Sequence, residues 1–235
     1  MGRGMSWLVR VARRVKNDDA FDIDAAVGLG VLTGELCRRS VMAARGLALA
    51  ARARGFAFPV FVGRGVVVTS PRYLHLSRGV TIGDYCRLDC LGKTGVVLGE
   101  GATLRRGVHI EVTSVLRDLG EGCVVGDRVG ISEGSFLGAK GLISIGSDSI
   151  IGPQTILVAE SHVFAERGRT VRSQGVTRRG ISVGRDCWIG GGVSVLDGVS
   201  IGEGCVVGAG SVLTRDLPDW SVALGSPAHV VRLRG

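Results

Sequence analysis

The sequence predicts an all-β repeat fold, a parallel β-helix, from two observations. Apolar residues recur at every sixth position between residues 181 and 213, and glycine follows four of the six. Small or β-branched residues stand two positions before each of them. A period of six fits neither an amphipathic helix nor one long alternating strand, but it fits short strands that turn corners, three to a coil. The apolar anchors are Val183, Ile189, Val195, Ile201, Val207 and Leu213.

The same period extends back to residue 58, so the β-helix is predicted over 58–215 with about seven coils. Its earlier repeats are less regular and contain short excursions. The C-terminal tail, 216–235, and the N-terminal segment are expected to cap the two ends, as repeat folds require. The predicted anchors before residue 181 are Val62, Val68, Leu76, Ile82, Leu88, Leu98, Leu104, Ile110, Leu119, Val125, Ile131, Leu137, Ile145, Ile151 and Leu157.

Residues 1–57 lack the period and predict a helical segment. A short amphipathic helix is expected around 7–15, and a second helical stretch over about 27–54, where Gly46 weakens the middle. Two interpretations stay open. The helices pack on the β-helix, or the second one is an interfacial helix that holds the protein near anionic lipid. No apolar run approaches the roughly 18 residues of a membrane span.

A long polar insertion, about 158–182, interrupts two well-formed coils and carries His162 near its base. Long loops inside compact repeats are usually functional or disordered. Histidine removes protons near neutral pH, because its ordinary pKa is near 6.5. His162 is therefore a candidate general base, with an ordinary loop histidine as the alternative. His75 and His109 precede anchors and should face outward. The insertion's arginines either meet an anionic acceptor or are simply solvated; they are Arg167, Arg169, Arg172, Arg178 and Arg179.

The net charge of +8 comes almost entirely from arginine. No nucleic-acid motif accompanies it, so the charge favours a phosphate-bearing cofactor. Of the six cysteines, Cys86, Cys123, Cys187 and Cys205 occupy the small inward position, which predicts buried thiols in a reducing compartment. No cysteine spacing suggests zinc. We expect a cytoplasmic protein, with peripheral contact at the inner face of the membrane as a further expectation.

Three blocks resemble the hexapeptide-repeat acyltransferases, in particular the sugar O-acetyltransferase branch that includes galactoside and maltose acetyltransferases and polysaccharide-modifying enzymes. They are IIGPQTILVAESHVF at 150–164, the repeats at 183–218 and SVALGSPAHVVR at 221–232. The resemblance implies a left-handed β-helix, against the usual crossover rule. It also implies a homotrimer with active sites between neighbouring prisms, acetyl-CoA as co-substrate without a metal, and a sugar or polysaccharide acceptor.

The resemblance also implies roles for single residues. His162 falls at the position of the catalytic histidine. Gly190, Gly191, Ala209 and Thr214 would line the thioester and pantetheine arm, and Arg215 and Arg232 would meet the CoA phosphates. His229 stands where some relatives have another basic residue. Ser132 or Glu133 falls near an acceptor-binding position.

Two further side chains have competing interpretations. Trp188 precedes an anchor and faces outward, so it forms either a wall of the acetyl-CoA or acceptor pocket or a trimer contact. Glu160 either orients the His162 imidazole or is a solvated loop charge.

Other functions of this fold leave their own marks in a sequence. An amino-sugar N-acetyltransferase stays open, and so does a non-catalytic β-helix scaffold. Serine acetyltransferases carry a His-Gly-Thr-Gly stretch that this chain lacks. Trimeric carbonic anhydrases of similar fold need three histidines as zinc ligands, two of them closely spaced, whereas the four histidines here are separated by 34, 53 and 67 residues.

Overall fold

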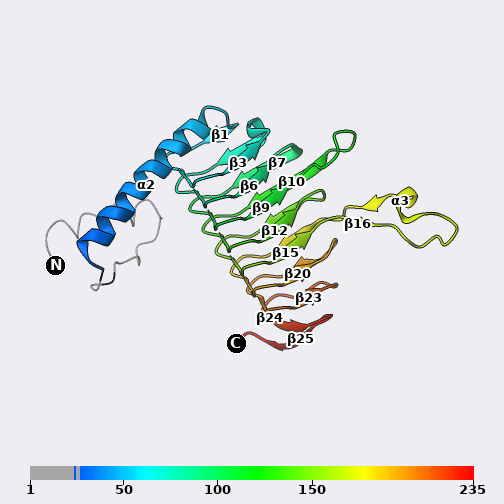
Figure 1. Cartoon of the computed structure of the whole chain (residues 1–235). Helices are drawn as coiled ribbons and strands as arrows, with labels where there is room; N and C mark the ends of the chain where they lie inside the picture. Colours follow the sequence, from blue (N-terminus) through cyan, green and yellow to red (C-terminus); the bar gives the residue numbers. More distant parts are fainter. Residues whose placement is uncertain (1–23, 25–26) are drawn as a thin grey trace.

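The computed structural model describes Asp24 and residues 27–235, which form a three-sided prism of parallel strands with one long helix at its N-terminal end (Figure 1). The chain passes in turn through sheets A, B and C, and each strand pairs with the strand one coil along. The predicted parallel β-helix is confirmed. The helix expected around 7–15 lies outside the described residues.

Sheets A and C each contain seven strands, and sheet B contains nine because the tail adds a hairpin. Sheet A consists of β1 (Gly55–Phe56), β4 (Leu74–Leu76), β7 (Gly92–Leu98), β10 (Gly120–Val125), β13 (Ile143–Ile145), β18 (Ile181–Val183) and β21 (Ser200–Ile201). Sheet B consists of β2 (Phe61–Val62), β5 (Thr81–Ile82), β8 (Thr103–Leu104), β11 (Gly130–Ile131), β14 (Ile150–Ile151), β19 (Trp188–Ile189), β22 (Val206–Val207), β24 (Ser221–Gly225) and β25 (Ala228–Leu233). Sheet C consists of β3 (Val67–Thr69), β6 (Arg87–Asp89), β9 (His109–Glu111), β12 (Phe136–Gly138), β15 (Ile156–Val158), β20 (Ser194–Val195) and β23 (Val212–Leu213). A short 3-10 helix, η1 (Pro71–Tyr73), precedes β4.

The core is a column of anchors stacked one coil apart. All six anchors between 183 and 213 are buried, as predicted. Each pairs with the anchor of the next coil on its own sheet: Val183 with Ile201, Ile189 with Val207, and Val195 with Leu213. This register keeps one apolar side chain per strand inside the prism and turns its neighbours outward.

One predicted anchor is wrong. Leu119 is 38% exposed, because residues 113–119 form a loop outside the strands and the chain re-enters sheet A only at Gly120. The spacing of six residues between Leu119 and Val125 therefore results only from the length of this loop. The anchor before Val125 is Ile110, on sheet C.

Glycine follows five of the seven sheet B anchors, because adjacent coils nearly touch at the next corner. A Cβ on Gly152 would lie 2.4 Å from the Gly191 nitrogen, and one on Gly190 would lie 2.6 Å from the Ala209 nitrogen. Real Cβ atoms do not approach backbone this closely. Side chains are therefore excluded at these glycine positions of the corner.

The long helix α2 (Leu29–Ala50) packs on β2 through Met42, Gly46 and Leu49, which are its only buried residues. A Cβ on Gly46 would lie 2.1 Å from the Val60 carbonyl oxygen. Gly46 is therefore the point of closest approach, a role that its low helix propensity alone does not reveal. Most of the helix surface stays exposed. No helix in the described part of the chain is long and apolar enough to cross a membrane.

All six cysteines are free thiols, and five of them are buried. Burial raises the pKa of Cys187 to about 11 and that of Cys90 and Cys123 to about 12. A thiol reacts as its thiolate, so these side chains stay protonated and inert near neutral pH. They act as small core residues.

Replacing Ile201 by Asp should prevent folding of the C-terminal coils, because the carboxylate would be buried beside Val183 without a partner. We expect loss of the cooperative thermal transition in circular dichroism. Ser182→Asp is the matched control, since Ser182 lies on the adjacent strand and is exposed. The register would be contradicted if both variants melted like the parent protein.

Candidate active site

The predicted long insertion projects from the prism as an ordered arm, residues 159–180 (Figure 1). Its base is an antiparallel hairpin of β16 (Ser161–His162) and β17 (Val176–Thr177), with the short helix α3 (Val171–Gln174) between the two strands. His162 pairs with Val176 and is exposed. The hairpin thus holds the candidate base just outside the prism, near the corner between sheets C and A.

A network of charges fixes the base of the arm. Arg178 donates to Glu160 at 2.8 Å and, with both terminal nitrogens, to the two carboxylate oxygens of Asp118 at 2.9 and 2.7 Å. Lys140 lies 3.4 Å from Glu160. The Arg178 and Glu160 side chains are only 19% and 16% exposed. Bidentate Arg–carboxylate pairs are among the stronger hydrogen bonds in proteins.

This network corrects two interpretations. Glu160 is neither a solvated charge nor the partner of His162, since its carboxylate is bound by Arg178 and Lys140. Arg178 is likewise engaged in structure and not available for an acceptor. The hydrogen bond from Arg178 holds the pKa of Asp118 below its usual value of 3.8. The pair is therefore fully formed at neutral pH, and its contribution is lost only as the pH falls through that lowered pKa.

Asp197 fixes the returning strand of the arm. One of its carboxylate oxygens accepts from the backbone N–H groups of Arg179 and Gly180 at 2.8 and 2.9 Å, and the other accepts from the Thr177 hydroxyl at 3.1 Å. The arm therefore leaves and re-enters the prism through fixed contacts. Sequence reasoning missed Asp197, Asp118 and Lys140, because nothing in the period of six marks them.

The corner between sheets B and C gathers five of the predicted site residues. It runs through four successive turns, at 132–134, 152–154, 190–192 and 208–210, linked by backbone hydrogen bonds from one turn to the next. Within the third turn, the N–H groups of Gly190 and Gly192 donate to Val207 and Pro153, each at 2.8 Å. The Gly191 N–H has no partner among the described residues. The predicted residues on this corner are Ser132, Glu133, Gly190, Gly191 and Ala209.

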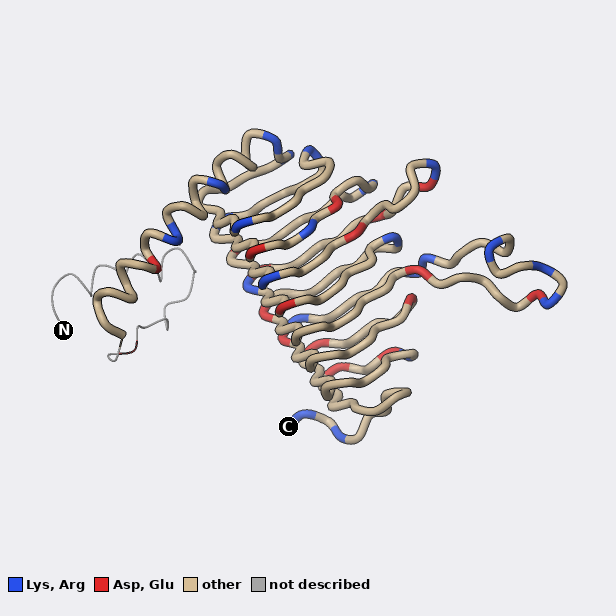
Figure 2. Tube along the Cα trace, viewed as in Figure 1, with Lys and Arg blue, Asp and Glu red and all other residues tan. Residues whose placement is uncertain are grey.

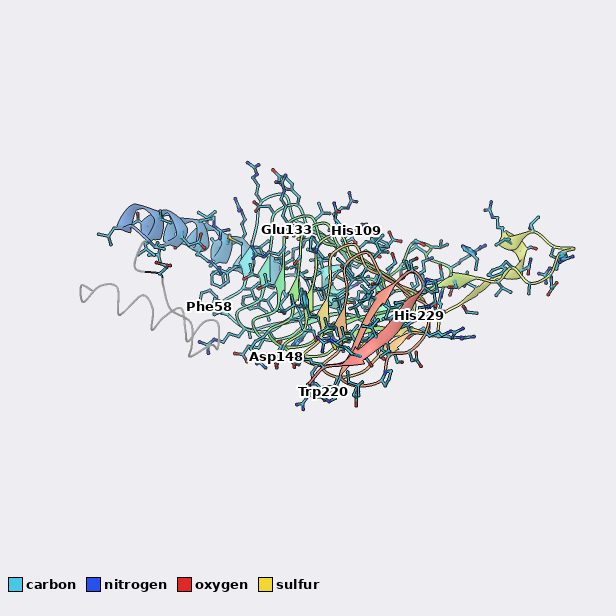
Figure 3. All side chains as sticks on the ribbon, turned by 90° about the horizontal axis from the view of Figure 1, so that it is seen from below. Phe58, His109, Glu133, Asp148, Trp220 and His229 are labelled. Carbon is cyan, nitrogen blue, oxygen red and sulfur yellow. The ribbon has the colours of Figure 1, made fainter. Side chains whose placement is uncertain are left out.

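The predicted phosphate-binding residues lie elsewhere. Thr214 and Arg215 follow β23, at the corner between sheets C and A, two coils beyond the strand that leads into the arm. Arg232 lies in β25, and His229 lies in the same C-terminal strand (Figure 3). All four side chains are exposed. Figure 3 shows Glu133 on the opposite side of the prism from Trp220.

Trp188 faces outward from sheet B, as predicted, and is 57% exposed. Its strand neighbour one coil back is Ile150, which is also exposed. On sheet C, Ile156 is exposed as well. The two sheets that flank the glycine-rich corner therefore both present apolar side chains to the outside.

The remaining histidines do not join the arm. His75 is exposed, and the His109 ring packs edge-on against Phe136 with centroids 5.2 Å apart. Both face outward, as predicted. Within residues 24 and 27–235, no group of three or more His, Cys, Asp or Glu side chains is arranged to hold a metal ion.

The comparisons with known proteins agree with this architecture. The family described as "Bacterial transferase hexapeptide (six repeats)" matches residues 180–215. A probable acetyltransferase of Mycobacterium tuberculosis is 32% identical over 129 residues, which is 55% of this chain and 43% of that protein. A Saccharomyces cerevisiae protein provisionally named as an acetyltransferase is 34% identical over 119 residues, 49% of this chain and 58% of its own. The chain thus spans about half the length of the curated relatives it matches.

Solved structures share the fold. A mutant of AntD, an N-acyltransferase from Bacillus cereus, was solved in complex with dTDP and coenzyme A; it superposes with a TM-score of 0.51 at 20% identity, over 75% of this chain and 81% of that one. Another mutant, in complex with dTDP-4-amino-4,6-dideoxyglucose and coenzyme A, gives 0.51 at 18% identity over 81% and 89%. At such identities the likeness establishes the β-helix and nothing finer.

Removing the Arg178 side chain should loosen the arm, because Asp118 and Glu160 both lose their guanidinium partner. We expect Arg178→Ala to increase the rate of chymotryptic cleavage after the exposed Phe164 several-fold, since local opening exposes the arm to proteases. Arg172→Ala, on the same arm and exposed, is the control. Equal cleavage rates in the two variants would show that the network does not fix the arm.

Proposed function

We propose that the protein is an acetyl-CoA-dependent O-acetyltransferase that moves an acetyl group to a hydroxyl of a sugar or of a polysaccharide unit. The observation that carries the proposal is that one chain presents both an exposed His162, on an arm held at its base by ion pairs, and a turn without side chains at Gly190 and Gly191. The acetyltransferase relatives and the hexapeptide match support the transferase class.

Coenzyme A is the expected carrier, as in the AntD complexes. Its pantetheine arm is thin and would lie along the glycine-rich corner, against Gly190, Gly191 and Ala209. Its phosphates need fixed cations, and charge-assisted bonds to guanidinium groups supply them. Arg215 and Arg232 are exposed near the C-terminal end of the prism and have no ion-pair partner among the described residues. The proposal requires no metal.

A complete site requires more than one copy of the chain. His162 projects near the corner between sheets C and A, whereas the glycine corner lies between sheets B and C, across the width of a sheet. We propose that the β-helix is left-handed and that, in a homotrimer, the arm of one copy faces the glycine corner of the next. The exposed apolar residues Ile150, Trp188 and Ile156 on the flanking sheets support such a contact.

In the proposed reaction, His162 takes the proton of the acceptor hydroxyl as its oxygen bonds to the acetyl carbon. The carbon–sulfur bond breaks, and the proton held by His162 returns to the departing thiolate. The Gly191 N–H is the free donor in its turn and would meet the negative charge that develops on the acetyl oxygen. Transfer is direct, because the five buried cysteines are core residues and none serves as a nucleophile. Ser132 and Glu133, on the same corner, would contact the acceptor.

His162→Ala should lower kcat about 10²-fold or more, the usual contribution of a positioned general base. Coenzyme A binding and assembly should be unchanged, since His162 makes no core contact and is exposed. The measurement is thiol release from acetyl-CoA with a panel of sugars. His75→Ala, at an exposed histidine of sheet A, is the control. A normal rate in His162→Ala would place the base elsewhere on the prism.

Arg215→Ala should raise the KM for acetyl-CoA with little effect on kcat or on the acceptor, because it removes a cation that meets the phosphates in both ground and transition states. Arg87→Ala, which removes an exposed arginine of sheet C near the other end of the prism, serves as the control. If both variants keep the parent's KM, the cofactor phosphates bind elsewhere.

Amino-sugar N-acetylation is the alternative reaction at the same site, and AntD is an N-acyltransferase of similar fold. The same panel decides between the two reactions when each sugar is offered in hydroxyl and amino forms. Faster acetylation of the amino forms would favour N-acetylation as the function over O-acetylation. If no acceptor led to thiol release, the non-catalytic scaffold would be the remaining hypothesis.

A further inference from the structure

The outer face of helix α2 is apolar or small, uncharged and exposed. Leu29, Leu36 and Leu47 are separated by seven and eleven residues, close to whole helical turns, and they are 73%, 52% and 52% exposed. They lie roughly a third of a turn around the helix from Met42, Gly46 and Leu49, which pack on β2. The exposed residues of this face are Leu29, Gly30, Thr33, Leu36, Cys37, Ser40, Val41, Ala44, Leu47 and Ala48.

A row of arginines borders this face. Arg38 and Arg45 are seven residues apart and line one edge of the helix between its outer face and the prism, and Arg52 continues the row in the turn just after the helix. Figure 2 shows the basic residues spaced along the helix. Arg38 is paired with Glu35 at 2.7 Å. Arg45 and Arg52 have no ion-pair partner in the described part of the chain.

The same edge opens into a cleft of about 330 Å³ between α2 and the first coil, which we call the arginine cleft. Arg45 from the helix, Arg52 from the turn just after it and Arg64 from the coil line the cleft, together with the apolar residues Leu49, Val62 and Val66. Arg64 lies over the Tyr85 ring, 5.4 Å from its centroid, and donates to the Tyr85 hydroxyl. The adjacent carboxylate, Asp84, accepts from the backbone N–H of Arg64 at 2.7 Å.

We propose that the arginine cleft binds the phosphate of an anionic membrane lipid while the outer face of α2 lies in the bilayer interface. Three guanidinium groups together with apolar side chains match a phosphate attached to an apolar tail. An uncharged exposed helix face bordered by basic residues is the form that interfacial helices take. Because the cleft carries excess positive charge, an anionic lipid surface fits it better than an uncharged face of another protein would.

This arrangement leaves the candidate active site free. Helix α2 lies at one end of the prism, and the arm projects from the opposite side in two perpendicular views (Figures 1 and 3). A protein resting on α2 would thus present the arm to the side away from the helix. The lipid site is independent of the proposed reaction, and its test needs no activity.

The test is sedimentation of the full chain with phosphatidylcholine vesicles, with and without phosphatidylglycerol. The protein should bind the anionic vesicles and be released by salt. The triple variant Arg45→Gln, Arg52→Gln, Arg64→Gln should lower the partition coefficient more than tenfold, since each basic residue near an anionic surface contributes about fivefold. The corresponding triple lysine variant should keep most of the binding, which separates loss of charge from loss of folding.

A charge-matched control removes three exposed arginines elsewhere, Arg117→Gln, Arg167→Gln and Arg172→Gln, and should change binding less than about threefold, because screening limits their reach. Leu36→Ser with Leu47→Ser should weaken binding as well.

Equal loss in the control triple, or equal binding to neutral vesicles, would overturn the proposal. So would a change in oligomeric state of the Leu variant with vesicle binding intact, which would make a second copy the occupant. Binding of inorganic phosphate by a protein that does not sediment with the anionic vesicles would point to a soluble ligand and would also overturn the proposal.

Discussion

The structure depends on how closely successive coils stack at the corners. Parallel strands one coil apart sit at the spacing of a hydrogen-bonded sheet, roughly 4.8 Å, and at Gly152 and Gly190 the next coil's backbone occupies the place of a Cβ. The anchors fill the inside of the prism, and at the glycine positions of the corner the backbone of the next coil leaves no room for a side chain. The same constraint that allows the coils to stack therefore requires glycine at positions such as 152 and 190. In the all-glycine turn at 190–192, the Gly191 N–H has no partner among the described residues.

The period of six predicted the fold because it follows directly from the close stacking of the coils. An inward position that takes an apolar residue and a corner position that is most often glycine recur wherever a coil is regular, and the six anchors from Val183 to Leu213 are all buried. The prediction failed where the chain leaves the prism. Leu119 keeps the spacing by the accident of a loop length, and it is exposed. The packing role of Gly46 could not be predicted for a related reason, since only the folded structure shows that the Val60 carbonyl lies against it.

Only part of the candidate site could be predicted from the sequence. His162 and the glycines of the turn at 190–192 could be found because they stand in recognisable blocks of sequence. The network that fixes the arm could not, because Arg178 and Asp118 are 60 residues apart and come from two separate insertions. Neither insertion has a period that would relate it to the other. Asp197 looks like any corner residue in sequence, and only its contacts with Arg179 and Gly180 reveal its part in holding the arm.

The basic charge of the chain is distributed according to what each arginine contacts. Arg178 and Arg128 are held by carboxylates of other segments, and the resulting hydrogen bonds raise the pKa of both. Such charges are internally compensated and add little attraction for a ligand. Arg45 and Arg52 are not compensated, and they sit beside Arg64 at one end of the prism. A net charge alone therefore says little about partners, because it counts paired and unpaired arginines alike. What distinguishes this end of the prism is an uncompensated cluster next to an uncharged, exposed helix face, whereas the charges at the base of the arm are paired.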